Sequence, residues 1–184
     1  MSPLRRLAVF AAASDGTDPA LRGAAYDVGA ELARRGIGLV YGAGGVGLMG
    51  ALSQGALDAG GEVIGVIPEE MILREWGRHD LTQLRVVRTM HERKALMADL
   101  ADAFLAIPGG LGTLEEIVEV WSWSYLGMLD EPVGFLNIGG FWDPFLATVR
   151  GMAEAGFVRG SAVQRLVVAP DLDQALAGLE ALVG

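Results

Sequence analysis

Short apolar runs alternate with longer amphipathic stretches along most of the chain. Many of the runs are continuously apolar, without the alternation of a half-exposed strand, which is typical of parallel strands covered on both faces. Apolar residues repeat at helical spacing in the longer stretches. We expect strands at residues 7–13, 37–41, 63–67, 84–87, 103–107, 133–137 and 166–168, and helices at 19–34, 47–59, 91–101, 113–126, 143–155 and 172–182.

This order of elements predicts one α/β domain over residues 1–184. Its expected architecture is Rossmann-like: a doubly wound, mostly parallel sheet with helices on both faces. Such sheets bind ligands in the crevice beyond the carboxyl ends of their strands. The loops that follow the strands are therefore the first places to look for chemistry.

The segment 108–116 is the most informative of these loops, because it follows an expected strand and opens an expected helix. Gly109, Gly110 and Gly112 let backbone N–H groups approach a ligand without obstruction by Cβ atoms. The start of a helix adds unpaired N–H donors and the positive end of its dipole. The segment therefore predicts an anion site, most plausibly for a phosphate group.

Three polar residues follow these glycines. Thr113 and Glu116 fit a capping box, with Thr113 as N-cap, and Glu115 and Glu116 are expected in the first helical turn. Helical phasing puts Glu115 and Glu119 on a solvated flank. Glu116 falls on a half-apolar edge, where a carboxylate is partly desolvated. Glu116 is thus either a cap or a catalytic acid.

Arg93 falls at helical spacing with Met90, Met97 and Leu100. An arginine on an apolar stripe either has a buried partner or extends past the methionines to water. The sequence leaves both options open. We expect the next residue, Lys94, to be solvated.

The segment 41–50 is a second glycine-rich loop. Gly42, Gly44 and Gly47 have the spacing of a dinucleotide fingerprint, but they follow the second strand and lack a well-placed acidic residue. The loop is either a packing turn or a second ligand-binding loop at the same sheet edge. Ser14, after the first strand, is expected at that edge too.

The composition narrows the class of protein. A net charge of −9 and a pI of about 4.6 argue against broad binding to nucleic acid or to anionic membranes. Cysteine is absent, and two histidines offer little to a metal centre. No apolar run approaches the length needed to span a membrane, so we expect a cytoplasmic protein.

The motif Pro108-Gly109-Gly110-x-Gly112-Thr113-x-x-Glu116, with Arg93-Lys94 upstream, resembles the LOG ("Lonely guy") family of cytokinin riboside 5′-monophosphate phosphoribohydrolases. Segments 42–50, 63–68 and 131–134 are similar as well, so the resemblance covers nearly the whole chain. It implies hydrolysis of a nucleoside 5′-monophosphate, such as a cytokinin riboside 5′-monophosphate or AMP, to free base and ribose 5-phosphate. It also implies a homodimer, with no cofactor and no metal. The label "lysine decarboxylase", often given to such proteins, has no support in a pyridoxal phosphate pattern.

By this resemblance, Arg93 and Glu116 carry the catalysis. One departure from the family lies at residues 9–14, where relatives often have Cys-Gly-Ser-Ser and only Ser14 keeps a hydroxyl. The alternatives are a non-catalytic nucleotide- or cofactor-binding protein of the same fold, and a nicotinamide-dependent oxidoreductase. The expected substrate contacts are Ser14, Gly42, Gly45, Met49, Met90, Arg93, Lys94, Gly109, Gly110, Gly112, Thr113 and Glu116.

Overall fold

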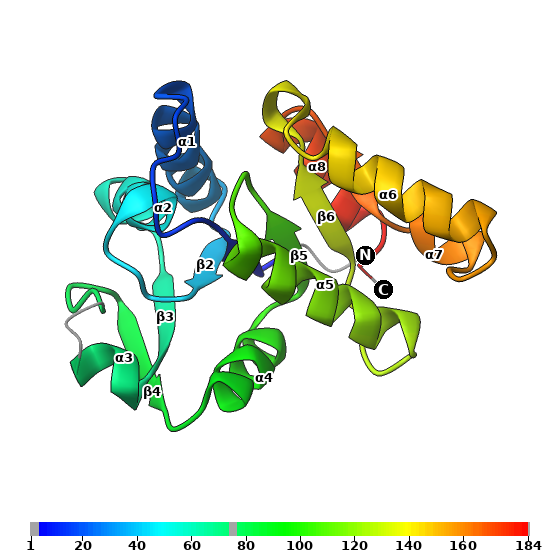
Figure 1. Cartoon of the computed structure of the whole chain (residues 1–184). Coiled ribbons are helices and arrows are strands. Elements are labelled where there is room, and N and C mark those ends of the chain that lie inside the picture. The colour runs from blue at the N-terminus through cyan, green and yellow to red at the C-terminus, as the bar shows by residue number, and fades with distance from the viewer. Residues whose placement is uncertain (1–3, 74–76, 184) are drawn as a thin grey trace.

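A computed structural model of the chain describes residues 4–73 and 77–183. Within these residues, seven parallel strands form one sheet in the order β4-β3-β2-β1-β5-β6-β7 (Figure 1). All the expected strands are present, most of them slightly shorter than predicted. Their bounds are β1 Arg6–Phe10, β2 Gly38–Tyr41, β3 Val63–Pro68, β4 Gln83–Val87, β5 Ala103–Ala106, β6 Val133–Leu136 and β7 Val167–Ala169.

All the expected helices are also present. Two short helices, α3 and α7, were not predicted, because five residues are too few to show a helical period. A 3-10 turn, η1 (Ile138–Gly140), follows β6. The helices are α1 Ala20–Arg34, α2 Gly47–Asp58, α3 Glu69–Leu73, α4 Met90–Leu100, α5 Leu111–Tyr125, α6 Asp143–Glu154, α7 Gly160–Gln164 and α8 Leu172–Glu180.

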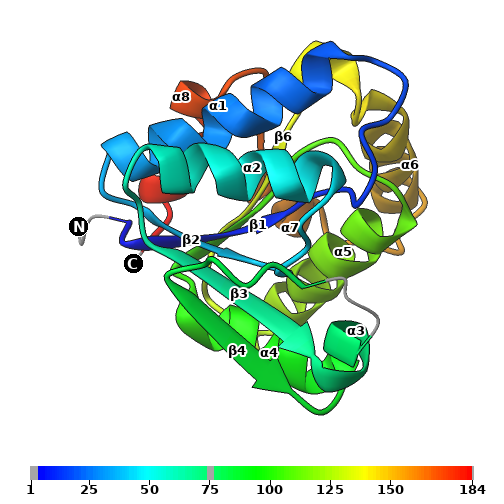
Figure 2. The ribbon, with the colours of Figure 1, turned by 90° about the vertical axis from the view of Figure 1, so that its left-hand side faces the viewer.

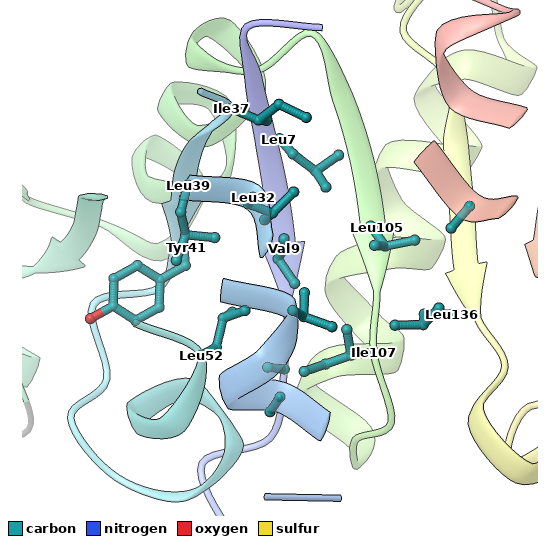
Figure 3. Close-up of a cluster of buried hydrophobic side chains, with 14 of the residues drawn as sticks. Leu7, Val9, Leu32, Ile37, Leu39, Tyr41, Leu52, Leu105, Ile107 and Leu136 are labelled. Carbon is teal, nitrogen blue, oxygen red and sulfur yellow. The ribbon is translucent and has the colours of Figure 1, made fainter. Parts of the chain in front are cut away.

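Alternate residues of the central strands face two separate cores. Leu7 and Val9 of β1 belong to the core shared with α1, α2 and α8, which also holds Tyr41 of β2 (Figure 3). Ala8 and Phe10 belong to the core shared with α4, α5 and α6. Figure 2 shows α1 and α2 side by side over one face of the sheet, with α4 on the other. Burial on both faces explains why the central strands are continuously apolar.

The strand order reverses at β1, which pairs with β2 on one side and with β5 on the other. The chain continues from β1 into α1 on one face of the sheet and from β5 into α5 on the other face. A crevice therefore forms beyond the carboxyl ends of β1 and β5. The loops after β1, β2 and β5 thus share one edge, as expected. None of the described helices is long and apolar enough to cross a membrane.

Candidate functional site

The start of α5 differs from the predicted capping box. The helix begins at Leu111 with Gly110 as its N-cap residue, so Thr113 lies within the first turn and Glu115 and Glu116 lie in the second. A glycine takes the extended N-cap conformation here, which makes a threonine cap unnecessary. The same Thr-x-x-Glu pattern does cap α4, where the side chain of Thr89 accepts a hydrogen bond from the backbone N–H of Glu92 at 3.1 Å.

Thr113 instead packs back against the glycine loop. A Cβ atom at Gly109 would overlap its side chain, so this approach requires glycine. Thr113 is buried, and its hydroxyl has no hydrogen-bond partner within the described part of the chain. The hydroxyl is therefore a buried polar group without a partner among the described residues, directly beneath the glycine loop.

The first turn of α5 keeps its donors free. Within residues 4–73 and 77–183, no side chain caps this helix. A pocket of about 230 Å³ lies beside the turn, and Ser14, Gly109, Gly110 and Phe141 contribute to its lining. The structure thus brings the loops after β1 and β5 together at an uncapped helix N-terminus, which is suited to an anion. No pattern in the sequence indicates Phe141, which reaches the pocket from the turn after β6.

Arg93 and Glu116 form a buried ion pair. Nη2 of Arg93 lies 3.2 Å from Oε1 of Glu116, and the two side chains are 8% and 12% exposed. Nε of Arg93 donates a hydrogen bond to the carbonyl oxygen of Val66 at 3.1 Å, and Nη1 lies 3.2 Å from Sδ of Met90. The option that Arg93 extends to water is therefore wrong. A backbone carbonyl such as that of Val66 leaves no signal in the sequence.

The second glycine-rich loop completes the slot for Arg93. A Cβ atom at Gly42 would overlap Nη2 of Arg93, so the guanidinium lies where a side chain would otherwise be. Met49 packs against the same loop at Gly44. Gly45, in contrast, is exposed and lines a separate depression with Arg78, away from the contacts of Arg93.

The ionisation of Glu116 reflects opposing influences. Burial raises the pKa of its carboxyl group, and the nearby Arg93 lowers it, with burial the larger effect. The result is a pKa above the ordinary value for glutamate. A carboxylate shifted in this way, in the second turn of a helix whose uncapped start is suited to an anion, is typical of a functional group.

Lys94 is not solvated, contrary to prediction. Its side chain is 6% exposed, and Nζ lies 2.6 Å from Oε1 of Glu115 and 2.7 Å from Oε2 of Glu119. Glu119 is also half-buried, although a solvated position was expected. Burial would lower the pKa of Lys94, but the bonds to the two carboxylates raise it above its usual value. The ammonium group of Lys94 is thus paired with two carboxylates of α5.

Known proteins resemble this chain over almost its whole length. Residues 49–179 match the family model described as "Possible lysine decarboxylase". The cytokinin riboside 5′-monophosphate phosphoribohydrolase LOG of Oryza sativa subsp. japonica is 44% identical over 182 residues, covering 99% of this chain and 75% of the relative. LOG3 of Arabidopsis thaliana, with the same enzyme name, is 44% identical over 179 residues, covering 97% and 83%.

Solved structures support the architecture. The X-ray structure of TM1055 superposes with a TM-score of 0.74 and 25% identity, covering 96% of this chain and 99% of that one. The molybdenum cofactor carrier protein of Chlamydomonas reinhardtii superposes with a TM-score of 0.70 and 22% identity over 97% of each chain, a likeness of fold alone. From the family model and the plant relatives together, this chain belongs to the LOG family of cytokinin riboside 5′-monophosphate phosphoribohydrolases.

Proposed function

We propose that this chain hydrolyses the N-glycosidic bond of a nucleoside 5′-monophosphate and releases the free base and ribose 5-phosphate. The observation that carries this proposal is the buried Arg93–Glu116 pair beside the uncapped start of α5. The names of the plant relatives give the same reaction and point to a cytokinin riboside 5′-monophosphate. AMP is the simplest substrate of this class.

The spacing along α5 fits such a substrate. Gly112 lies in the first turn and Glu116 four residues later, which is about 6 Å along a helix axis. That distance is on the scale of the span from a 5′-phosphate to C1′ of the same ribose. A phosphate held by the N–H groups of the first turn and by the hydroxyl of Thr113 therefore brings the sugar alongside Glu116, so binding energy is used for orientation.

The chemistry requires negative charge near the sugar. In the hydrolysis, a water oxygen bonds to C1′ while the C1′–N bond breaks, and the base leaves with the bonding electrons and a proton. The transition state resembles an oxocarbenium ion. In our proposal, the Glu116 carboxylate stabilises this positive charge and holds the ribose hydroxyls or the water. Arg93 keeps Glu116 ionised and assists the departing base or a phosphate oxygen.

The remaining substrate contacts are assigned by position. Met49 and Met90 lie around the slot of Arg93 and supply apolar surface for a base. Ser14 lies beside the glycines that would hold the phosphate. We do not propose Lys94 as a substrate contact, because its ammonium group is already paired with two carboxylates. A homodimer and a cytoplasmic location stay predictions from the sequence.

A substrate panel tests the proposal. The chain is incubated with AMP, with isopentenyladenosine 5′-monophosphate and with adenosine, and the released base is quantified by chromatography. We expect free base from the two monophosphates and far slower release from adenosine, because adenosine lacks the group that the start of α5 binds. Equal hydrolysis of adenosine and AMP would contradict the phosphate site, and no release from any monophosphate would contradict the proposed reaction.

A further inference from the structure

We propose that Lys94 is a positioning residue, which holds α5 at the register where Glu116 meets Arg93. We call Lys94, Glu115 and Glu119 the lysine clamp. The inference rests on the proposed function, because it assigns the clamp a part in the same reaction. It differs from a direct role for Lys94 in substrate binding.

The geometry of the clamp links the two helices that carry the catalytic pair. Lys94 follows Arg93 directly on α4, and Glu115 directly precedes Glu116 on α5. Glu115 and Glu119 are one helical turn apart, and both carboxylates lie within 2.7 Å of Nζ. One ammonium group therefore contacts two successive turns of α5. A rotation or a slide of α5 breaks at least one of these contacts.

Because Lys94 is buried, its charge depends on these two carboxylates for compensation. A lysine is almost never fully buried without a partner, because removing its charge from water is costly. Here the side chain is 6% exposed, while Glu115 is mostly exposed to solvent. Loss of the carboxylates leaves a buried unpaired cation, so the pairing favours the position of α5 at which both acids reach Lys94. That position also places Glu116 3.2 Å from Arg93.

The clamp also acts on the charge of Glu116. The charged groups that affect its carboxyl are Arg93 and Lys94 of α4, which lower its pKa, and Glu115 and Glu119 of its own helix, which raise it. Removing the lysine and removing the two acids thus shift the pKa of Glu116 in opposite directions. Both changes remove the same link between α4 and α5.

Two variants separate positioning from substrate binding. Lys94→Met keeps most of the volume of the side chain without its charge, and the double variant Glu115→Gln/Glu119→Gln keeps the lysine without its partners. We expect kcat for AMP to fall about 10- to 100-fold in both variants, as for a small misplacement of a catalytic group. We expect KM for AMP and the preference for AMP over adenosine to stay within about threefold of wild type. Lys94→Arg, which keeps the charge, should restore part of the lost kcat.

The acid limb of the kcat profile gives the second measurement. It should move to higher pH in Lys94→Met and to lower pH in the double variant. The carbon-13 signal of the Glu116 carboxyl, assigned with Glu116→Gln, should titrate with the same opposite shifts, and this readout does not require activity.

Specific outcomes overturn the inference. An unchanged kcat in Lys94→Met, or a KM that rises while kcat is kept, would assign Lys94 to another role. Shifts of the Glu116 titration in the same direction in both variants would do so too. If wild type releases no base from any monophosphate, the proposed function fails. The carbon-13 titration of Glu116 in the two variants then decides alone whether the lysine clamp acts on the Glu116 carboxyl.

Discussion

Nη2 of Arg93 lies 3.2 Å from Oε1 of Glu116, and this contact joins two helices on the same face of the sheet. Arg93 reaches that position by crossing the carboxyl end of β3, where Nε donates to the carbonyl oxygen of Val66. Both side chains are largely buried. The pair therefore links α4 to α5 and also holds a charged carboxyl group on the helix whose start is the expected phosphate site.

Replacing Arg93 with alanine should abolish turnover and destabilise the fold. Removal of one partner from a buried ion pair leaves an uncompensated charge, at a cost of about 3–5 kcal/mol. Urea denaturation measures the loss of stability, and release of adenine from AMP measures turnover. Arg93→Lys should recover part of the stability but little of the activity, because lysine lacks the planar group that contacts Val66 and Glu116 together. Full activity in either variant would contradict a direct role for Arg93.

Replacing Gly42 with alanine should displace the guanidinium group of Arg93 while the arginine itself is kept. The backbone of Gly42 is not among the positive-φ positions, so alanine is allowed there, but its Cβ would overlap Nη2 of Arg93. We expect the guanidinium to move and kcat to fall about 100-fold, since a displacement of about 1 Å can have that effect. The matched control is Gly23→Ala on α1, where a Cβ meets no atom within 4 Å. Equal activities of the two variants would show that the slot at Gly42 does not position Arg93.

The stability of the fold should depend on the ionisation of Glu116. Burial raises the pKa of its carboxyl above the ordinary 4.5, so the folded state favours the protonated form. The contribution of this group to the free energy of unfolding then has its full value at pH values below the pKa of the carboxyl in the unfolded chain. It is lost as the pH rises through the pKa of the carboxyl in the folded state. The free energy of unfolding of wild type, relative to Glu116→Gln, should therefore fall across that interval. A difference that rises with pH would contradict the direction of the shift.

Activity should have the opposite dependence on pH. The proposed reaction needs the carboxylate, so kcat should fall as the pH drops below the raised pKa of Glu116. Arg93 lowers that pKa, so the acid limb of any residual activity in Arg93→Lys, which keeps a positive charge, should lie near that of wild type. The pH–rate profiles of wild type and Arg93→Lys measure the positions of the two acid limbs.

The sequence predicted the sheet well because its central strands are buried on both faces. Leu7, Val9 and their neighbours form runs that no exposed segment would carry, and the glycine loops mark where those runs end. The sequence also placed Arg93 on an apolar stripe and Glu116 on a half-apolar edge. It did not predict their contact from periodicity alone, because the contact depends on how α4 and α5 pack across the sheet.

The errors around α5 have physical causes. The Thr-x-x-Glu pattern at Thr113 fits a capping box, but Gly110 takes the extended N-cap conformation and the helix starts two residues before the predicted start. The sequence predicts a solvated Lys94, because helical phasing within α4 contains no information about Glu115 and Glu119 on another helix. Local patterns thus identified the candidate residues, while their partners came from the tertiary structure.

Release of adenine from AMP by wild type and by Glu116→Gln tests the central claim most directly. The substitution keeps the size of the side chain and removes its charge. The matched control is Glu180→Gln at the exposed end of α8. We predict that wild type and Glu180→Gln release adenine and ribose 5-phosphate at the same rate, with one molecule of each product per AMP. Circular dichroism should show that Glu116→Gln is folded. Its rate should be at least about 100-fold lower, because charge stabilisation of the transition state is removed. Release of adenine by folded Glu116→Gln at the wild-type rate would contradict the account.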